Sequence, residues 1–122
     1  MPFSHQIAHE VGKMWTKAAG PIHYSEIEDH IKAEVSESAQ FYPELVDAAQ
    51  AKAALTPLEV RQVVNIMRQI GDTSHLGPTA VVVSDDITYG MLRMLGILIE
   101  DVYAVQVFRR MDDAERWLGW KT

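Results

Sequence analysis

The segment Thr-Ala-Val-Val-Val-Ser, residues 79–84, decides the fold of this chain. Its β-branched side chains favour an extended strand. Apolar and polar residues do not alternate along it, as they would in a strand with one face in water. We therefore expect both faces of this strand to be buried, as in the interior of a mostly parallel sheet. The apolar segment that follows, residues 87–99, should form a helix that lies across this sheet.

Strands and helices alternate on both sides of this segment. The pattern predicts an opening hairpin and two further strands, at residues 3–19 with a turn near 10–12, at 45–49 and at 104–109. It predicts helices at residues 24–38, 57–70 and 86–100, and a short one at the C-terminus. The order β-β-α-β-α-β-α-β-α indicates one α/β domain over residues 1–122. We expect a mostly parallel sheet of four or five strands with an N-terminal hairpin and about four helices.

Capping signals mark where two of these helices begin. Thr56 can cap the second helix, Pro57 suits its first position, and Glu59 can close a capping box with Thr56. The same reasoning assigns Asp112 as the cap of the last helix, with Glu115 as its capping-box partner.

Composition and charge exclude several classes of function. The chain has no cysteine, which excludes disulfides, thiolate catalysis and cysteine-bound metals. Its net charge of −6 argues against binding to nucleic acid. Residues 1–10 lack the basic and apolar regions of a signal peptide, so we expect a cytoplasmic protein. The apolar stretch Met91–Ile99 is interrupted by Arg93 and is too short to span a membrane.

The sequence predicts neither a catalytic site nor a metal site. Its glycines form no phosphate-binding loop of a known type, and no GxSxG motif is present. The five histidines are not paired at a spacing that suits one metal ion, so we expect each at the surface or its boundary. The enzyme alternative would place a site at the carboxyl edge of the sheet, near Asp47, Ser84, Asp85 and Arg109. Because these residues do not pair a nucleophile with a base, we predict no enzyme activity and no cofactor.

Four short motifs in the second half of the chain resemble the SpoIIAA-like family, a branch of the STAS-like domains that is similar in fold to CRAL-TRIO lipid-binding domains. The motifs are LGPTAVVV at 76–83, YGMLRM at 89–94, VFR at 107–109 and AERWL at 114–118. The resemblance implies a sheet of four or five strands covered by helices, no enzymatic activity, and a regulatory or binding role. Sporulation relatives carry a phosphorylated serine at a helix start, and residues 47–52, taken as the equivalent, contain no hydroxyl. We therefore expect no phosphorylation.

The helix Ile87–Ile99 is the candidate binding element, because apolar residues cover nearly every face of it. Such a helix packs within a thick core, forms the contact face of a homodimer or protein complex, or lines a pocket for an apolar ligand or lipid. We favour a binding or regulatory module that acts through protein contact or self-association, with the apolar ligand as the alternative. The candidate binding residues are Tyr89, Met91, Arg93, Met94, Phe108 and Arg109.

These residues have distinct expected roles. A pocket between the helix and the sheet would be bordered by Tyr89, Met91, Met94 and Phe108. Arg93 either extends its head group to water or anchors an acidic group, and Arg109 either pairs with a nearby Asp or binds an acidic partner. Gly90 lowers the helix propensity, which a close approach of the helix to the sheet, or a guest lying against the backbone, would explain.

Overall fold

The computed structural model describes residues 2–122; Met1, with which the predicted domain begins, lies outside the described residues. The chain forms one five-stranded sheet with four helices in the described part. The elements are β1 (Phe3–Ala8), β2 (Lys13–Ile22), α1 (Tyr24–Ser36), β3 (Glu44–Ala53), α2 (Pro57–Gly71), β4 (Thr79–Val83), α3 (Asp86–Ile99), β5 (Val105–Phe108) and α4 (Met111–Trp117). This order and the α/β class confirm the prediction.

The strands lie in the order β1-β2-β3-β4-β5. The hairpin of β1 and β2 is antiparallel, and every other neighbouring pair is parallel. The β4 strand lies between β3 and β5, so that Val82 is level with Asp47 on one side and Phe108 on the other. Residues Val81, Val82 and Val83 are 7%, 4% and 0% exposed. The valine segment is therefore the buried interior strand that its composition indicates.

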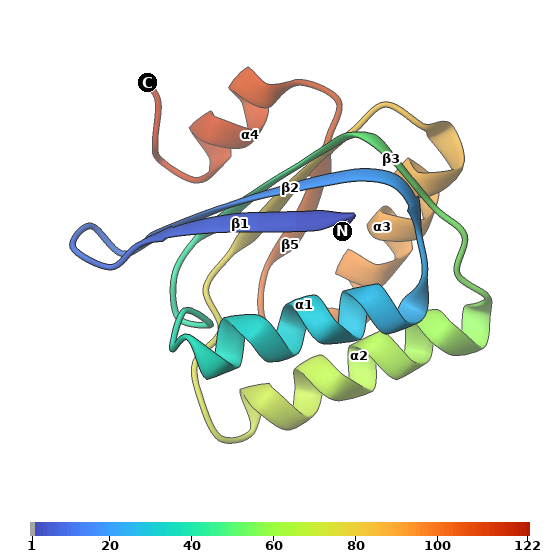
Figure 1. The fold of residues 1–122 in the computed structure, drawn as a ribbon, viewed down its shortest axis with the longest axis horizontal. Helices are drawn as coiled ribbons and strands as arrows, with labels where there is room; N and C mark the ends of the chain where they lie inside the picture. The colour runs from blue at the N-terminus through green and yellow to red at the C-terminus, as the bar shows by residue number, and fades with distance from the viewer. Residues whose placement is uncertain (1) are drawn as a thin grey trace.

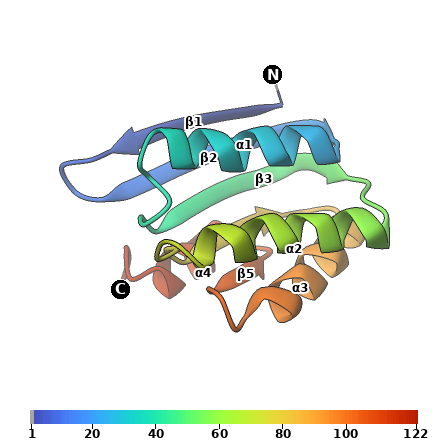
Figure 2. The ribbon, with the colours of Figure 1, turned by 90° about the horizontal axis from the view of Figure 1, so that it is seen from below.

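Helices cover the two faces of the sheet unequally. Figures 1 and 2 show α1, α2 and α3 together on one face, with α4 alone on the other. Alternate side chains of β4 supply the two cores: Val81 and Val83 belong to the cluster beneath the three helices, and Val82 packs with Ala114 of α4. Because successive side chains of a strand point to opposite faces, β4 contributes to the cores on both sides of the sheet.

The capping prediction holds for α2 and is wrong for α4. The Thr56 side chain accepts a hydrogen bond from the backbone N–H of Glu59, and the Glu59 side chain accepts one from the backbone N–H of Thr56. Helix α4 begins at Met111, so Asp112 lies inside its first turn instead of capping it. There its carboxylate accepts a hydrogen bond from Nζ of Lys121 at 2.9 Å and is favoured by the helix dipole.

Two strands are longer than the sequence indicates. The β2 strand continues through Pro21, because beyond Ala18 it pairs with β3 and no longer with β1, which leaves the missing N–H of proline without consequence. The β3 strand extends to Ala53. The segment 47–52, in which we sought a hydroxyl at a helix start, therefore lies inside β3, and the helix after β3 begins at Pro57.

The first explanation offered for Gly90, a close approach of α3 to the sheet, is wrong, because Gly96 makes that approach. A Cβ built on Gly96 would lie 2.5 Å from the carbonyl oxygen of Val105 in β5. A Cβ built on Gly90 would have no described atom within 4 Å. At the start of the same helix, Asp85 caps α3 by accepting hydrogen bonds from the backbone N–H and the hydroxyl of Thr88.

Candidate binding cavity

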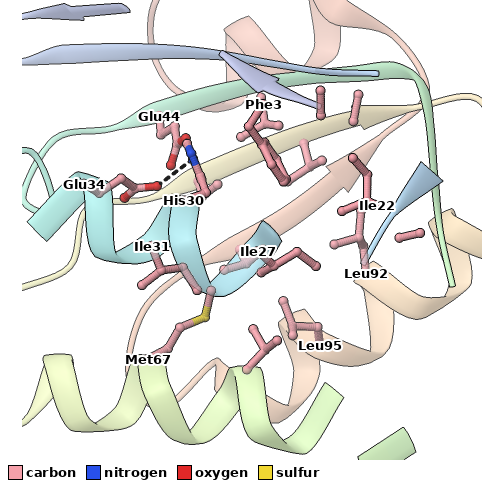
Figure 3. A pocket seen from close by; sticks show the side chains of 18 of the residues that line it. Phe3, Ile22, Ile27, His30, Ile31, Glu34, Glu44, Met67, Leu92 and Leu95 are labelled. Carbon is pink, nitrogen blue, oxygen red and sulfur yellow. Dashed lines mark hydrogen bonds and ion pairs between the residues drawn. The ribbon is translucent and has the colours of Figure 1, made fainter. Parts of the chain in front are cut away.

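A cavity of about 150 Å³ lies between the sheet and the three helices α1, α2 and α3. Figure 3 shows side chains from all three helices and from the sheet converging on it. Its wall is mostly aliphatic, with contributions that include Ile22 of β2, Ile27 and Ile31 of α1, Met67 of α2, and Leu92 and Leu95 of α3. The helical side chains among these lie on the faces of α1, α2 and α3 that pack toward the sheet, so the residues that form the core also form the cavity wall.

One end of the cavity is polar. His30 and Glu34 lie one turn apart on α1, and Glu44 is the first residue of β3. The Nε2 atom of His30 lies 3.0 Å from Oε1 of Glu34 and 2.9 Å from Oε2 of Glu44 (Figure 3). Thr16 of β2 donates its hydroxyl to the same Glu44 oxygen at 2.6 Å. We call His30, Glu34 and Glu44 the acid–imidazole cluster.

The acid–imidazole cluster is shielded from water to different degrees. The side chains of Glu44, His30 and Glu34 are 4%, 9% and 18% exposed, so the cluster meets solvent mainly at Glu34. The ring of Phe3 stacks on the ring of His30, with centroids 4.8 Å apart, and covers it from the β1 side. A cluster of three ionisable groups in such surroundings must share protons to limit its net charge.

The pKa shifts describe this sharing. Burial by itself lowers the pKa of His30, but its hydrogen bonds to Glu34 and Glu44 outweigh burial and raise the pKa to about 10. Burial, followed by the negative charge of Glu44, raises the pKa of Glu34 to about 8. Burial opposes ionisation of Glu44 as well, yet the hydrogen bonds from His30, Glu34 and Thr16 hold the pKa of Glu44 below its usual value. At neutral pH the cluster thus holds imidazolium, one carboxylate and one carboxylic acid.

Gln40 brings a further acceptor to the cavity. It lies between α1 and β3 and lines the cavity with the acid–imidazole cluster. Within residues 2–122, its buried Oε1 atom has no hydrogen-bond partner. A buried acceptor without a donor costs about 1–3 kcal/mol, which a guest with a hydrogen-bond donor would recover.

The same cluster also has the composition of a cation site. The imidazole and the two carboxylates each offer one ligand atom, and these atoms lie within 4.8 Å of one another. A histidine with two carboxylates suits a divalent transition metal once the shared protons have left. The sequence analysis did not bring these three residues together. His30 is partly buried, which agrees with the expectation that the histidines lie at the surface or its boundary.

The predicted binding residues are distributed over several surfaces. Met91 lines the cavity, together with its neighbours Leu92 and Leu95. Met94 is 44% exposed on the outer side of α3. Phe108 packs against Trp117 of α4, on the opposite face of the sheet. The structure therefore brings one of the four residues of the predicted pocket to the cavity.

The remaining predicted residues lie at the carboxyl edge of the sheet or at the surface. Arg109 donates hydrogen bonds to the carbonyl oxygen of Ser84 at 2.9 Å and to Asp86 at 2.7 Å, and lies 4.2 Å from the ring centre of Tyr89. Arg93 is exposed on α3. The polar end of the cavity is instead at the amino edge, where β3 begins at Glu44.

Comparison with known proteins adds one finding. No family model matches this chain, and no curated protein does so. A solved structure of an uncharacterised protein from the DUF3478 family with a SpoIIAA-like fold, from Shewanella loihica PV-4, is similar with a TM-score of 0.63. The identity is 15%, and the match covers 95% of this chain and 93% of that chain. The chain therefore has a SpoIIAA-like fold, as its motifs predicted. Within residues 2–122, no helix is both long and apolar enough to cross a bilayer.

Proposed function

We propose that this chain is a non-enzymatic binding module that takes a small, mostly apolar molecule into the cavity between the sheet and α1, α2 and α3. The observation that carries the proposal is an aliphatic cavity wall with one polar end. Binding sites for small molecules commonly combine an apolar lining with a few convergent polar groups. A cavity with perturbed ionisable groups is also a stronger candidate than an apolar void alone.

The volume of the cavity limits the size of the guest. A dry apolar cavity of about 150 Å³ holds a molecule of the size of benzene, and the cavity here has this volume. A guest of about six to eight non-hydrogen atoms fits, whereas the long acyl chain of a lipid does not. The sequence analysis offered an apolar ligand or a lipid as an alternative function, and the cavity volume favours a small apolar ligand over a lipid.

Filling the cavity tests this proposal. Ile27→Phe adds volume at a half-buried residue of the cavity wall, and Ile97→Phe makes the same change on α3, where Ile97 is 59% exposed. Calorimetric titration with benzene and with 1-hexanol should show binding to the wild type and to Ile97→Phe. Ile27→Phe should bind both at least about tenfold more weakly. Equal affinities for all three proteins would refute the proposed site, provided that circular dichroism shows Ile27→Phe to be folded.

Self-association is a second candidate function, and an exposed apolar face of α3 favours it. Ile87, Met94, Ile97 and Leu98 are 77%, 44%, 59% and 42% exposed. Their spacing places them on one side of the helix, turned away from the sheet. The partner that we propose for this face is a second copy of the chain, related by a twofold axis.

Sedimentation velocity tests self-association. The wild type should form dimers as its concentration rises, and Ile97→Ser should shift this equilibrium to monomer. Leu58→Ser is the matched control, because Leu58 is 65% exposed on α2 and lies away from this face. A wild type that stays monomeric at millimolar concentration would exclude this function.

A further inference from the structure

The polar end of the cavity defines which chemical group the guest presents there. Two donors at this end are already engaged, since His30 Nε2 lies between the two carboxyl groups and the Thr16 hydroxyl donates to Glu44. The Tyr103 hydroxyl, also in the cavity wall, donates to Sδ of Met67 at 3.2 Å. Two acceptors at this end remain available to a guest: the carboxyl oxygens of Glu34 and, within residues 2–122, the unpartnered Oε1 of Gln40.

The charges of the same groups disfavour an acidic guest. Two acidic side chains and one imidazole already share protons at this end, so the carboxylate of a guest would add a negative charge beside Glu34 in a poorly solvated place. An ammonium group would be attracted to the two carboxyl groups that meet at this end. A hydroxyl group carries no charge and offers the donor that Gln40 lacks.

We infer that the guest, a molecule of about six to eight non-hydrogen atoms, carries a hydrogen-bond-donating head group, an ammonium or a hydroxyl, on an apolar body, and that this head group binds between Glu34 and Gln40. This inference rests on the proposed function and adds the chemical class of the ligand. The apolar body would extend along the aliphatic wall toward Ile27 and Leu95 (Figure 3). The head group would enter last and lie nearest to solvent, because Glu34 is the most exposed member of the cluster.

Four six-carbon probes separate the possible head groups: 1-hexylamine, 1-hexanol, hexanoate and benzene. By calorimetry at pH 7, hexylamine or hexanol should bind about tenfold or more tightly than hexanoate, the ratio expected when a buried acceptor gains or lacks its donor. Hexanoate binding as tightly as the best donor would overturn the inference and leave the proposed function standing. Binding of none of the four probes would overturn the proposed function itself.

A variant of Gln40 tests the position of the head group. Gln40→Met keeps the length of the side chain and removes its acceptor oxygen. The affinity for hexylamine and hexanol should fall about fivefold or more, while the affinity for benzene stays the same. A parallel loss for benzene would mean that Gln40 only shapes the cavity, and this would contradict the assigned contact.

Discussion

Two glycines of the same helix should respond to alanine in opposite directions. Gly90 lies in an exposed turn of α3, where an added methyl group meets no described atom within 4 Å. Gly90→Ala should therefore gain the difference in helix propensity, about 1 kcal/mol. In a chain of 122 residues, this corresponds to a rise in the melting temperature of about 4 °C.

Gly96→Ala should destabilise the protein. The new Cβ would lie 2.5 Å from the carbonyl oxygen of Val105, and this backbone atom cannot rotate away as a side chain would. Helix α3 must then move away from β5, at a cost of about 1–3 kcal/mol that exceeds the gain in propensity. The net change should be a loss of up to about 2 kcal/mol.

Urea denaturation of both variants at low micromolar concentration, followed by circular dichroism, measures these changes in the free energy of unfolding. The low concentration keeps any self-association through α3 out of the result. A Gly96→Ala variant as stable as the wild type would show that α3 does not approach β5 as described. A Gly90→Ala variant of reduced stability would show that another part of the chain covers this turn.

Three further predictions concern stability. Val82→Asp should leave the protein unfolded by circular dichroism, because an isolated carboxylate has no partner in the interior of β4; a folded variant would contradict the burial of this strand. Thr56→Ala should lower the free energy of urea unfolding by about 1 kcal/mol through loss of the cap, and an unchanged value would show that the cap contributes nothing. Stability should fall by more than about 2 kcal/mol from pH 5 to pH 9, since folding raises the pKa of Glu34 from 4.5 to about 8 and that of His30 from 6.5 to about 10. Both groups take up protons on folding, so their stabilisation is complete at low pH and is lost as the pH rises through these pKa values. A free energy of unfolding in urea that increases from pH 6 to pH 9 would contradict this assignment.

The fold was predictable because local signals and their spacing agree along the chain. The valine segment could be assigned to the interior without any knowledge of its neighbours, since neither of its faces carries a polar side chain. The capping box at Thr56 and Glu59 located the start of α2 to the residue. Prediction was less successful where pairing decides the outcome, as in β2, which passes through Pro21 because its outer neighbour has ended there.

The candidate site was predictable only in part. The spacing of His30 and Glu34 indicates that the two side chains share one helix face, and this was the signal available in the sequence. It could not show that Glu44 joins them, since this requires knowing that the first residue of β3 points toward α1 and not toward α4. The choice of α3 as the candidate binding element correctly placed Met91 at a cavity. This choice did not identify the polar end of the cavity, because the cavity lies under three helices and reaches from α3 to α1.

The location of a bound guest tests the central claim most directly. Methyl-labelled protein titrated with 1-hexanol reports on the cavity through Ile31 and Leu95, and on the opposite face of the sheet through Val82. The account predicts saturable shifts and intermolecular nuclear Overhauser effects at Ile31 and Leu95, with Val82 unaffected. Shifts confined to the exposed methyl groups of Ile97, or absent throughout, would contradict it.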